Sequence, residues 1–600
     1  MSDSRLDEIK NKIIKQHEGD QRQLEVIFSE EPRIIVEAPA GYGKTTTMIS
    51  RIAYLYATGR IPNPKKVLGL TFSVNAALKV KREVAEKLPL YINATNNPIS
   101  VGSKVTVTNF HGFCKGVLRK HGYLLSEHLR HKDINSMRAF GSESLEKNID
   151  IKRILGNEYC QFLINTEKQV KNSEIPSREV IAQYNKIVLN KLVPRDLITH
   201  DAVLFLTISL FLNYPNVKEF YSNYYPLIVV DEFQDTNCIA WALLNCLISE
   251  RSQLLFLGDP LQRIYGFIGA VPSIMSVAAE QLAMKPIALN QNYRFRNNKE
   301  MLLLDSNIRA NAVANFKPGK LETANIPAFW GEDQKAESKA VIDKILDLKE
   351  KTNSKIVILF RSRNDNAAVF EQTITENQID YFYGMYTDED QVYVDFHNHC
   401  KSMFESRFGR NNSVTNRQLN TFADTVELAF PSEDKKAVSS LCALLRAFIK
   451  KVNADYSELQ PEEKYELVLD VFENRQLKQA MEYVDSNLIL ATMHGAKGLE
   501  WDYVFIPDLE RYLMPSFTCG ECCNRNSKPI KCKCQLPQVI PQDIFNRLLD
   551  ELSVFYVAVT RARKQVFVSA SRKRVNGLEG AYSCFTTIEG ITLVNGSNIN

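Results

Sequence analysis

A short glycine-containing segment near the start of the chain has the residue types that bind phosphate. It reads APAGYGKT over residues 38–45, follows a β-branched run and precedes a stretch with helical spacing. Glycines allow backbone N–H groups to surround phosphate oxygens at a helix N-terminus. In such a loop Lys44 reaches the β- and γ-phosphates and the Thr45 hydroxyl holds Mg²⁺. The alternative is a strand-to-helix turn that is merely rich in glycine.

Two acidic residues, Asp231 and Glu232, directly follow the apolar run LIVV. An aspartate at a strand end can hold Mg²⁺ through water, and the neighbouring glutamate can orient or deprotonate an attacking water. A solvated loop could carry the same pair. Combined with the phosphate-binding segment, the pair indicates a catalytic site for phosphoryl transfer.

Five of the twelve cysteines lie between residues 519 and 534. Two close pairs of thiolates suit a tetrahedral Zn²⁺ ion, and the predicted ligands of a structural zinc are Cys519, Cys522, Cys532 and Cys534. Unliganded thiols and an iron–sulfur or redox centre are the alternatives, since thiol ligation does not separate zinc from iron.

The elements that position these residues are predicted from short apolar runs that end in polar residues. The first half of the chain contains RIIVE, KKVLGLTFS, YPLIVVDEF and QLLFLGD, and the second half contains SKIVILFRSR, NLILATMHG, DYVFIPDL and QVFVSAS. Helical stretches lie between the runs, a pattern typical of parallel sheets with crossover helices. We therefore expect an α/β fold with two sheets, with the chemistry at the carboxyl ends of the strands.

The length and composition agree with several domains in one chain. The 600 residues are 44% hydrophobic and 24% charged, which indicates a folded globular protein of about three to five domains or subdomains. The net charge is only +4, so a polyanion must meet a local basic groove. With neither an apolar run long enough to cross a bilayer nor a signal-peptide pattern, we expect a cytoplasmic location.

Seven motifs, in order from Gln23 to Arg563, resemble those of the superfamily 1A DNA helicases of the UvrD/Rep/PcrA family. They read DQRQLEVI, APAGYGKT, LIVVDEFQD, LGDPLQRIYGFIGA, LNQNYR, ATMHGAKGLE and DELSVFYVAVTRAR. The resemblance implies two RecA-like P-loop domains with two mainly helical insertions. The expected boundaries are 1–114 with 222–284 for the first core domain, 115–221 for its insertion, 285–386 with 485–600 for the second core domain, and 387–484 for a shortened second insertion.

The resemblance also implies roles for individual residues. The catalytic set would be Lys44, Asp231, Glu232, Gln262, Arg294 and Arg561, with the two arginines stabilising the transferring phosphoryl group and Gln262 coupling nucleotide to DNA. ATP would be held by Gln23 and Tyr293 at adenine, by Glu500 at ribose, by Ala40, Gly41, Gly43, Lys44 and Thr45 of the phosphate-binding segment, and by Thr46 directly after it. Thr45 and Asp231 would bind Mg²⁺. Thr46 stands where relatives often have an arginine beside the adenine.

Aromatic and polar residues at strand and motif ends are the predicted DNA contacts, because stacking on bases tolerates any sequence. They are Phe72, Asn75, Phe110, His111, Tyr265, Phe267 and His494. The alternative for each aromatic residue is a place in the hydrophobic core.

The resulting hypothesis is an ATP- and Mg²⁺-dependent helicase or translocase that moves 3′ to 5′ on single-stranded or forked DNA, in repair, replication or phage defence. A second hypothesis is a DNA-sensing ATPase subunit that controls a partner nuclease, as in Gabija-type anti-phage systems, because the second insertion is short.

Overall fold

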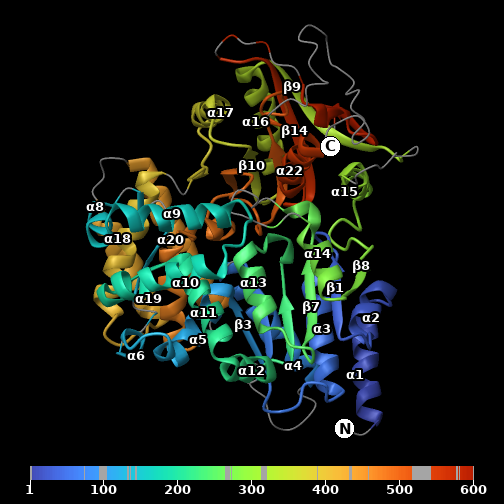
Figure 1. The fold of residues 1–600 in the computed structure, drawn as a ribbon. Coiled ribbons are helices and arrows are strands. Elements are labelled where there is room, and N and C mark those ends of the chain that lie inside the picture. The colour runs from blue at the N-terminus through green and yellow to red at the C-terminus, as the bar shows by residue number, and fades with distance from the viewer. Residues whose placement is uncertain are drawn as a thin grey trace. The chain divides into compact units, whose positions relative to one another are not determined.

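The computed structural model describes residues 3–72, 74–92, 104–131, 134, 137–141, 145–146, 148–263, 271, 273–312, 321–387, 390–430, 435–456, 459–516, 542–575, 577, 579 and 582–598. The chain divides into two units, Met1–Gln291 and Asn292–Asn600, here called unit 1 and unit 2. Figure 1 shows both, coloured along the chain.

Unit 1 is built on a six-stranded parallel sheet with the strand order β3-β2-β6-β7-β1-β8. The strands are β1 (Arg33–Glu37), β2 (Val67–Thr71), β3 (Val105–Asn109), β6 (Leu227–Val230), β7 (Gln253–Gly258) and β8 (Lys285–Ala288). The four strands predicted in this half are β1, β2, β6 and β7, and all four are confirmed.

Both faces of this sheet are buried, which explains why its strands are continuous apolar runs. In β7, Leu254 and Phe256 pack into the core on one face, and Leu255 and Leu257 pack into the core on the other. The core with Leu255 includes residues of α1 (Asp3–Gln16), α2 (Gln21–Phe28), α3 (Lys44–Ala57) and α4 (Val74–Ile92). The core with Leu254 includes residues of α5 (Phe110–His121), α11 (His200–Asn213), α13 (Cys238–Leu247) and α14 (Ile274–Gln281).

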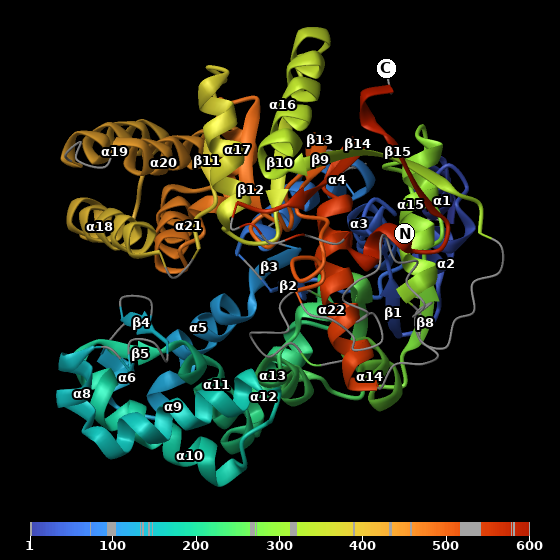
Figure 2. The same ribbon diagram turned by 90° about the horizontal axis from the view of Figure 1, so that it is seen from above.

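The chain between β3 and β6 is mainly helical, as expected for the first insertion. Its further helices are α6 (His128–His131), α8 (Ile149–Leu155), α9 (Asn157–Lys171), α10 (Arg178–Ile187) and α12 (Pro215–Tyr224). A small parallel pair, β4 (Arg138–Phe140) with β5 (Leu197–Thr199), was not predicted. Figure 2 shows this pair beside α6 and α8.

Unit 2 contains a seven-stranded parallel sheet with the order β11-β12-β10-β13-β14-β9-β15. The strands are β9 (Ala324–Asp333), β10 (Ile356–Phe360), β11 (Phe382–Gly384), β12 (Leu488–Thr492), β13 (Trp501–Ile506), β14 (Ala562–Lys573) and β15 (Ile591–Asn595). The four predicted strands of this half, β10, β12, β13 and β14, are adjacent in the sheet. The α/β class with two sheets is therefore confirmed.

The helices of unit 2 fall into two groups. The first group comprises α15 (Lys299–Ala312), α16 (Gln334–Lys351), α17 (Asp365–Glu376) and α22 (Gln542–Val559). The second lies between β11 and β12 and comprises α18 (Gln391–Phe408), α19 (Asn416–Ala429), α20 (Lys435–Asp455), α21 (Pro461–Glu473) and the 3₁₀ turn η10 (Leu477–Tyr483). Figure 2 shows the helices of this second insertion gathered together.

The sheet pairing differs from the expected boundary between the core domains. We expected the second core domain to begin at residue 285, but β8 pairs in parallel with β1 and completes the first sheet. The reason is that KPIA is too short and too polar to be recognised as a strand by its own pattern. The division into units accordingly falls after Gln291. Among the described residues, no helix is both long and apolar enough to cross a membrane.

Candidate nucleotide site and its polar network

The phosphate-binding segment connects β1 to α3. Gly41 and Gly43 have φ angles of 84° and 77°, a left-handed conformation that glycine adopts without steric cost. Gly43 is the N-cap of α3, so it offers no side chain to the first-turn N–H groups, which remain for the oxygens of a ligand. Lys44 and Thr45 are the first two residues of this helix. The geometry is that of a phosphate cradle.

Lys44 lies against both predicted carboxylates. Its Nζ atom is 3.0 Å from Oδ1 of Asp231 and forms a second ion pair with Oε1 of Glu232. Burial opposes the positive charge, but the two carboxylates outweigh it and raise the pKa of Lys44 above its ordinary value. The structure thus brings together three of the predicted catalytic residues.

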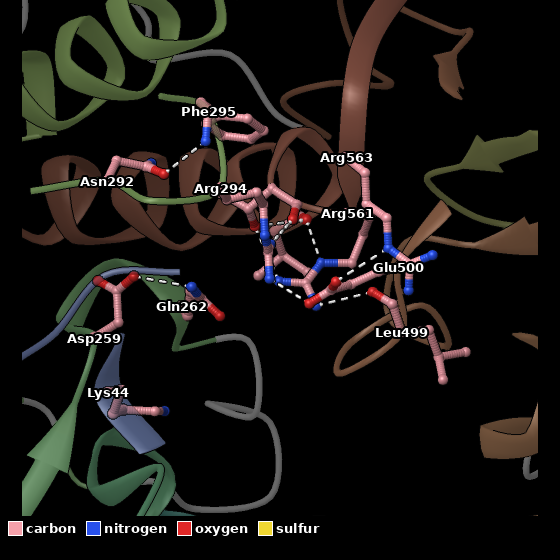
Figure 3. A network of polar contacts seen from close by, with 12 residues as sticks. Lys44, Asp259, Gln262, Asn292, Arg294, Phe295, Leu499, Glu500, Arg561 and Arg563 are labelled. Carbon is pink, nitrogen blue, oxygen red and sulfur yellow. Dashed lines mark hydrogen bonds and ion pairs between the residues drawn. The ribbon is translucent and has the colours of Figure 1, made fainter. Parts of the chain in front are cut away.

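A chain of hydrogen bonds extends from Glu232 to Gln262 through the Gln234 side chain and through the backbone and side chain of Asp259. Gln234, which is 1% exposed, donates from Nε2 to Oε2 of Glu232 at 2.6 Å, and its Oε1 accepts from the backbone N–H of Asp259 at 3.0 Å. Asp259 in turn accepts from Nε2 of Gln262 at 2.9 Å (Figure 3). Glu232 itself has a left-handed φ of 53°, an uncommon conformation for a non-glycine residue that often occurs at functional sites.

Gly258, the last residue of β7, leaves room for the Gln234 amide. A Cβ atom at Gly258 would lie 2.6 Å from Oε1 of Gln234 and 3.2 Å from its backbone nitrogen. Any side chain at this position would therefore displace the amide that links Glu232 to Asp259.

The predicted adenine-reading residue, Gln23, is also hydrogen-bonded to the phosphate-binding segment. Its Nε2 donates to the backbone carbonyl of Tyr42 at 3.0 Å, and its Oε1 is hydrogen-bonded to Nδ1 of His17. Gln23 is the third residue of α2. Asp20 caps that helix by accepting a hydrogen bond from the backbone N–H of Gln23. Gln23 therefore has a defined orientation next to the phosphate-binding segment.

The predicted arginine and glutamate of unit 2 bind each other. Arg294 forms an ion pair through Nη2 with Oε1 of Glu500, and its Nη1 donates to the carbonyl of Thr560 (Figure 3). Arg563 lies 3.4 Å from the other carboxylate oxygen of Glu500. The neighbouring Tyr293 is half-buried.

Arg561 is 4% exposed and binds acceptors within its own unit. Its Nε donates to the carbonyl of Val557 at 2.9 Å, its Nη1 to the carbonyl of Leu499 at 3.2 Å, and its Nη2 to the hydroxyl of Thr560 at 3.0 Å. The guanidinium therefore satisfies the carbonyl of Val557 near the C-terminal end of α22, where a positive charge is favourable.

The predicted DNA contacts have different environments. Phe72 is half-buried just after β2, whereas Phe110 is 4% exposed and packs in the hydrophobic core of unit 1. Phe110 thus offers no free ring face for a base, and the core alternative holds for it, because α5 begins at this residue and turns it inward. The side chain of Asn75 and all of Tyr265 and Phe267 lie outside the described residues.

The two predicted histidines are half-buried and neutral. Burial lowers the pKa of His111 to about 3, and burial together with the positive charge of Arg361 lowers the pKa of His494 to about 4. A neutral imidazole can accept or donate a hydrogen bond, but it provides no charge for a DNA phosphate.

Oxygen ligands for a magnesium ion are present at the phosphate-binding segment. Thr45 and Asp231 would provide a hydroxyl and a carboxylate, the donor types that Mg²⁺ prefers. Within the described part of the chain, no group of three or more histidine, cysteine or acidic residues is arranged to hold a metal. The four predicted zinc ligands, Cys519, Cys522, Cys532 and Cys534, lie outside that part, so the zinc site stays a prediction.

Sequence reasoning missed several polar contacts, two of them at the site and others elsewhere, in unit 2. Gln234 and Asp259 lie inside recognised motifs, but their spacing did not reveal that they are hydrogen-bonded. Arg361, which follows β10, forms a bidentate ion pair with Glu551 of α22 at 2.8 and 3.2 Å, and Ser516 donates to the same carboxylate at 2.9 Å. These contacts join segments that are far apart in the chain.

Comparison with known proteins identifies the family. Residues 20–283 match the UvrD/REP helicase N-terminal domain, and residues 392–573 match the UvrD-like helicase C-terminal domain. A probable DNA helicase II homolog of Mycoplasma pneumoniae is 25% identical over 89% of this chain and 81% of its own length. The ATP-dependent DNA helicases PcrA of Staphylococcus epidermidis and Staphylococcus aureus are 23% and 24% identical, each over 92% of this chain and 83% of the relative.

The chain belongs to the UvrD/Rep/PcrA family of superfamily 1A, and it is a helicase enzyme. The resemblance drawn from the seven motifs is thereby confirmed.

Proposed function

We propose that this helicase hydrolyses ATP at the site on unit 1 and uses the energy to move along DNA. The observation that carries the proposal is the contact of Lys44 with both Asp231 and Glu232 at the start of α3. A γ-phosphate at the helix N-terminus competes with the carboxylates for Lys44, and its arrival releases Glu232 to act on water. The relatives that carry the name ATP-dependent DNA helicase support the same reaction.

Other residues have proposed roles in binding and in the transition state. Gln23 reads the adenine, and Arg294 stabilises the transferring phosphoryl group. Arg561 joins Arg294 once its hydrogen bonds to the carbonyls of Val557 and Leu499 open. Mg²⁺ held by Thr45 and Asp231 supplies Lewis-acid stabilisation of the phosphate oxygens. Gln262 couples the nucleotide to the DNA, and its bonded path to Glu232 through Asp259 and Gln234 supports that role.

The proposed track is single-stranded DNA, and the proposed direction is 3′ to 5′. The half-buried Phe72 after β2, with His111 and His494, would contact the strand, and Tyr265 and Phe267 join them on the sequence pattern alone. The name of the Mycoplasma pneumoniae relative, a probable DNA helicase II homolog, supports DNA as the track.

The decisive experiment is steady-state ATP hydrolysis with and without single-stranded DNA. We expect strong stimulation by DNA, and Mg²⁺ chelation should abolish turnover. Displacement of streptavidin from a biotinylated 5′ end, and not from a 3′ end, would establish the direction. Hydrolysis that DNA leaves unchanged would contradict the coupling of the reaction to a track.

A second candidate function is a DNA-sensing ATPase subunit that controls a partner nuclease in phage defence. The observation in its favour is the small second insertion, which contains only four α-helices and one 3₁₀ turn among the described residues between β11 and β12. Purification of the protein from its native source, followed by mass measurement of the complex, separates the two candidates. A stable nuclease partner supports the second, and a solitary chain supports the first.

A further inference from the structure

A buried histidine lies directly behind Gln23, the residue proposed to read the nucleotide base. His17 is 2% exposed and Gln23 is 3% exposed. Nδ1 of His17 is hydrogen-bonded to Oε1 of Gln23, and Nε2 of His17 lies 2.8 Å from the hydroxyl of Ser50 on α3. The Ser50 hydroxyl lies 3.3 Å from the hydroxyl of Tyr91 on α4. Both ring nitrogens of His17 therefore have a hydrogen-bond partner, Gln23 on one side and Ser50 on the other.

The two protein partners of Gln23 fix the orientation of its amide. The backbone carbonyl of Tyr42 can only accept a hydrogen bond, so the nitrogen of the Gln23 amide must face it. The amide oxygen then faces His17, and His17 must carry its proton on Nδ1 in order to donate. Nε2 is left as an acceptor for the hydroxyl of Ser50, and burial lowers the pKa of His17, which agrees with a neutral ring.

The orientation of this amide decides which purine it recognises. Adenine presents an amino group that donates and an N7 that accepts, whereas guanine presents an oxygen that accepts at the corresponding position. One lone pair of the Gln23 oxygen is bound to His17, and one hydrogen of its amide nitrogen is bound to Tyr42. The second lone pair and the second hydrogen remain for a base. If the oxygen of the Gln23 amide is fixed, it accepts a hydrogen bond from the adenine amino group. If the amide can rotate and exchange its oxygen with its nitrogen, it can also donate to the guanine oxygen.

We infer that His17 is a positioning residue that helps to make the nucleotide site selective for adenine over guanine, by holding the oxygen of the Gln23 amide while the Tyr42 carbonyl holds its nitrogen. This inference rests on the proposed function, in which Gln23 contacts the base. His17 acts through Gln23 and does not touch the nucleotide itself.

The test compares hydrolysis of ATP and GTP by His17→Ala, His17→Leu and His17→Asn, with DNA present. Alanine and leucine lack a donor, and we expect the ratio of kcat/KM for ATP over GTP to fall about five- to tenfold, the worth of one hydrogen bond. The change should appear in KM for ATP, with kcat nearly constant. The amide of asparagine supplies a donor close to the position of Nδ1, so His17→Asn should retain most of the selectivity.

Two further variants make the outcome specific. Tyr91→Phe alters the far end of the same hydrogen-bonded chain and should leave the ratio unchanged. Gln23→Ala should lower the ratio, and His17→Ala should add nothing to that effect, because a positioning residue works only through its target. A wild-type ratio in His17→Ala or His17→Leu, together with a reduced ratio in Gln23→Ala, overturns the inference and leaves the proposed function standing.

Other outcomes are equally informative. An unchanged ratio in Gln23→Ala removes Gln23 from the base site, and an absence of ATP hydrolysis by the wild-type protein contradicts the proposed function. If the donor-free variants do not fold, NMR of wild-type protein labelled with ¹⁵N-histidine gives the tautomer of His17, assigned by its loss in His17→Asn. A proton on Nδ1 supports the inference, and a proton on Nε2 overturns it.

Discussion

Arg294 and Glu500 form an ion pair within unit 2, although family resemblance assigns them to opposite ends of the nucleotide. Arg294 is expected at the γ-phosphate and Glu500 at the ribose. Their side chains are 17% and 22% exposed, so both groups are accessible to a ligand. Arg294 and Glu500 therefore bind each other in place of a ligand. A nucleotide that contacts them must break this ion pair.

The first prediction concerns this pair. Arg294→Ala should lower kcat for ATP by roughly 10³-fold or more, because an arginine that stabilises a transferring phosphoryl group contributes at least that much. Glu500→Gln should instead change KM for ATP and leave kcat within about twofold, because uniform binding affects KM alone. Steady-state kinetics with single-stranded DNA present distinguishes the two. Equal losses of kcat in both variants would show that the ion pair itself, and not the separate contacts to nucleotide, matters for turnover.

The second prediction concerns the proposed base. Glu232→Gln should retain ATP binding and lose turnover by roughly 10³-fold, because the amide keeps the shape of the side chain but cannot take a proton from water. The exposed Glu250, changed to Gln, is the matched control in the same unit and should behave as the wild type. Binding of a fluorescent ATP analogue and phosphate release measure the two effects. Substantial hydrolysis by Glu232→Gln removes this residue from its role.

The third prediction tests the bonded path between Glu232 and Gln262. Gln234→Ala should reduce kcat about tenfold with nucleotide affinity unchanged, and it should cost about 1–3 kcal/mol of stability, because buried partners lose their hydrogen bonds. Gly258→Ala should produce a similar loss of kcat, since its Cβ would lie 2.6 Å from the Gln234 amide oxygen.

A second glycine provides the control for this pair of variants. Gly116 lies inside α5 with no atom within 4 Å of an added Cβ, so Gly116→Ala should leave kcat unchanged and stabilise the helix slightly. If Gly258→Ala retains full activity, the position of the Gln234 amide does not control catalysis.

The strands that sequence predicted are those buried on both faces, because continuous apolar runs identify them. Two of the strands that it missed, β8 and β9, lack a continuous apolar run for different physical reasons. β9 contains proline, glycine and acidic residues within ANIPAFWGED, and β8 has only Ile287 buried among its four residues. Only the pairing of β8 with β1, and of β9 with β14 and β15, identifies these two segments as strands.

The candidate site shows the same division. Lys44 and the Asp231–Glu232 pair were predicted because glycine spacing and strand ends constrain where such residues can lie. His17 and Gln234 were not, since an amide or an imidazole acquires its role from a partner across the fold, and no spacing along the chain encodes that partner. Phe110 was assigned to DNA for the complementary reason: its place beside polar residues in TNFHGF is visible in the sequence, whereas its inward direction is not.

The last prediction separates core from interface at the two aromatic residues that follow β2 and β3. Phe110→Ala should destabilise unit 1 by about 3–5 kcal/mol, because it removes a buried ring and leaves a cavity. Phe72→Ala should change stability far less and should weaken single-stranded DNA binding by about 1–3 kcal/mol, the contribution of one stacked base. Denaturant unfolding and fluorescence anisotropy of a labelled oligonucleotide measure the two effects separately. If Phe72→Ala binds DNA as tightly as the wild type while unfolding more easily, Phe72 is a core residue as well, and the track must contact unit 1 elsewhere.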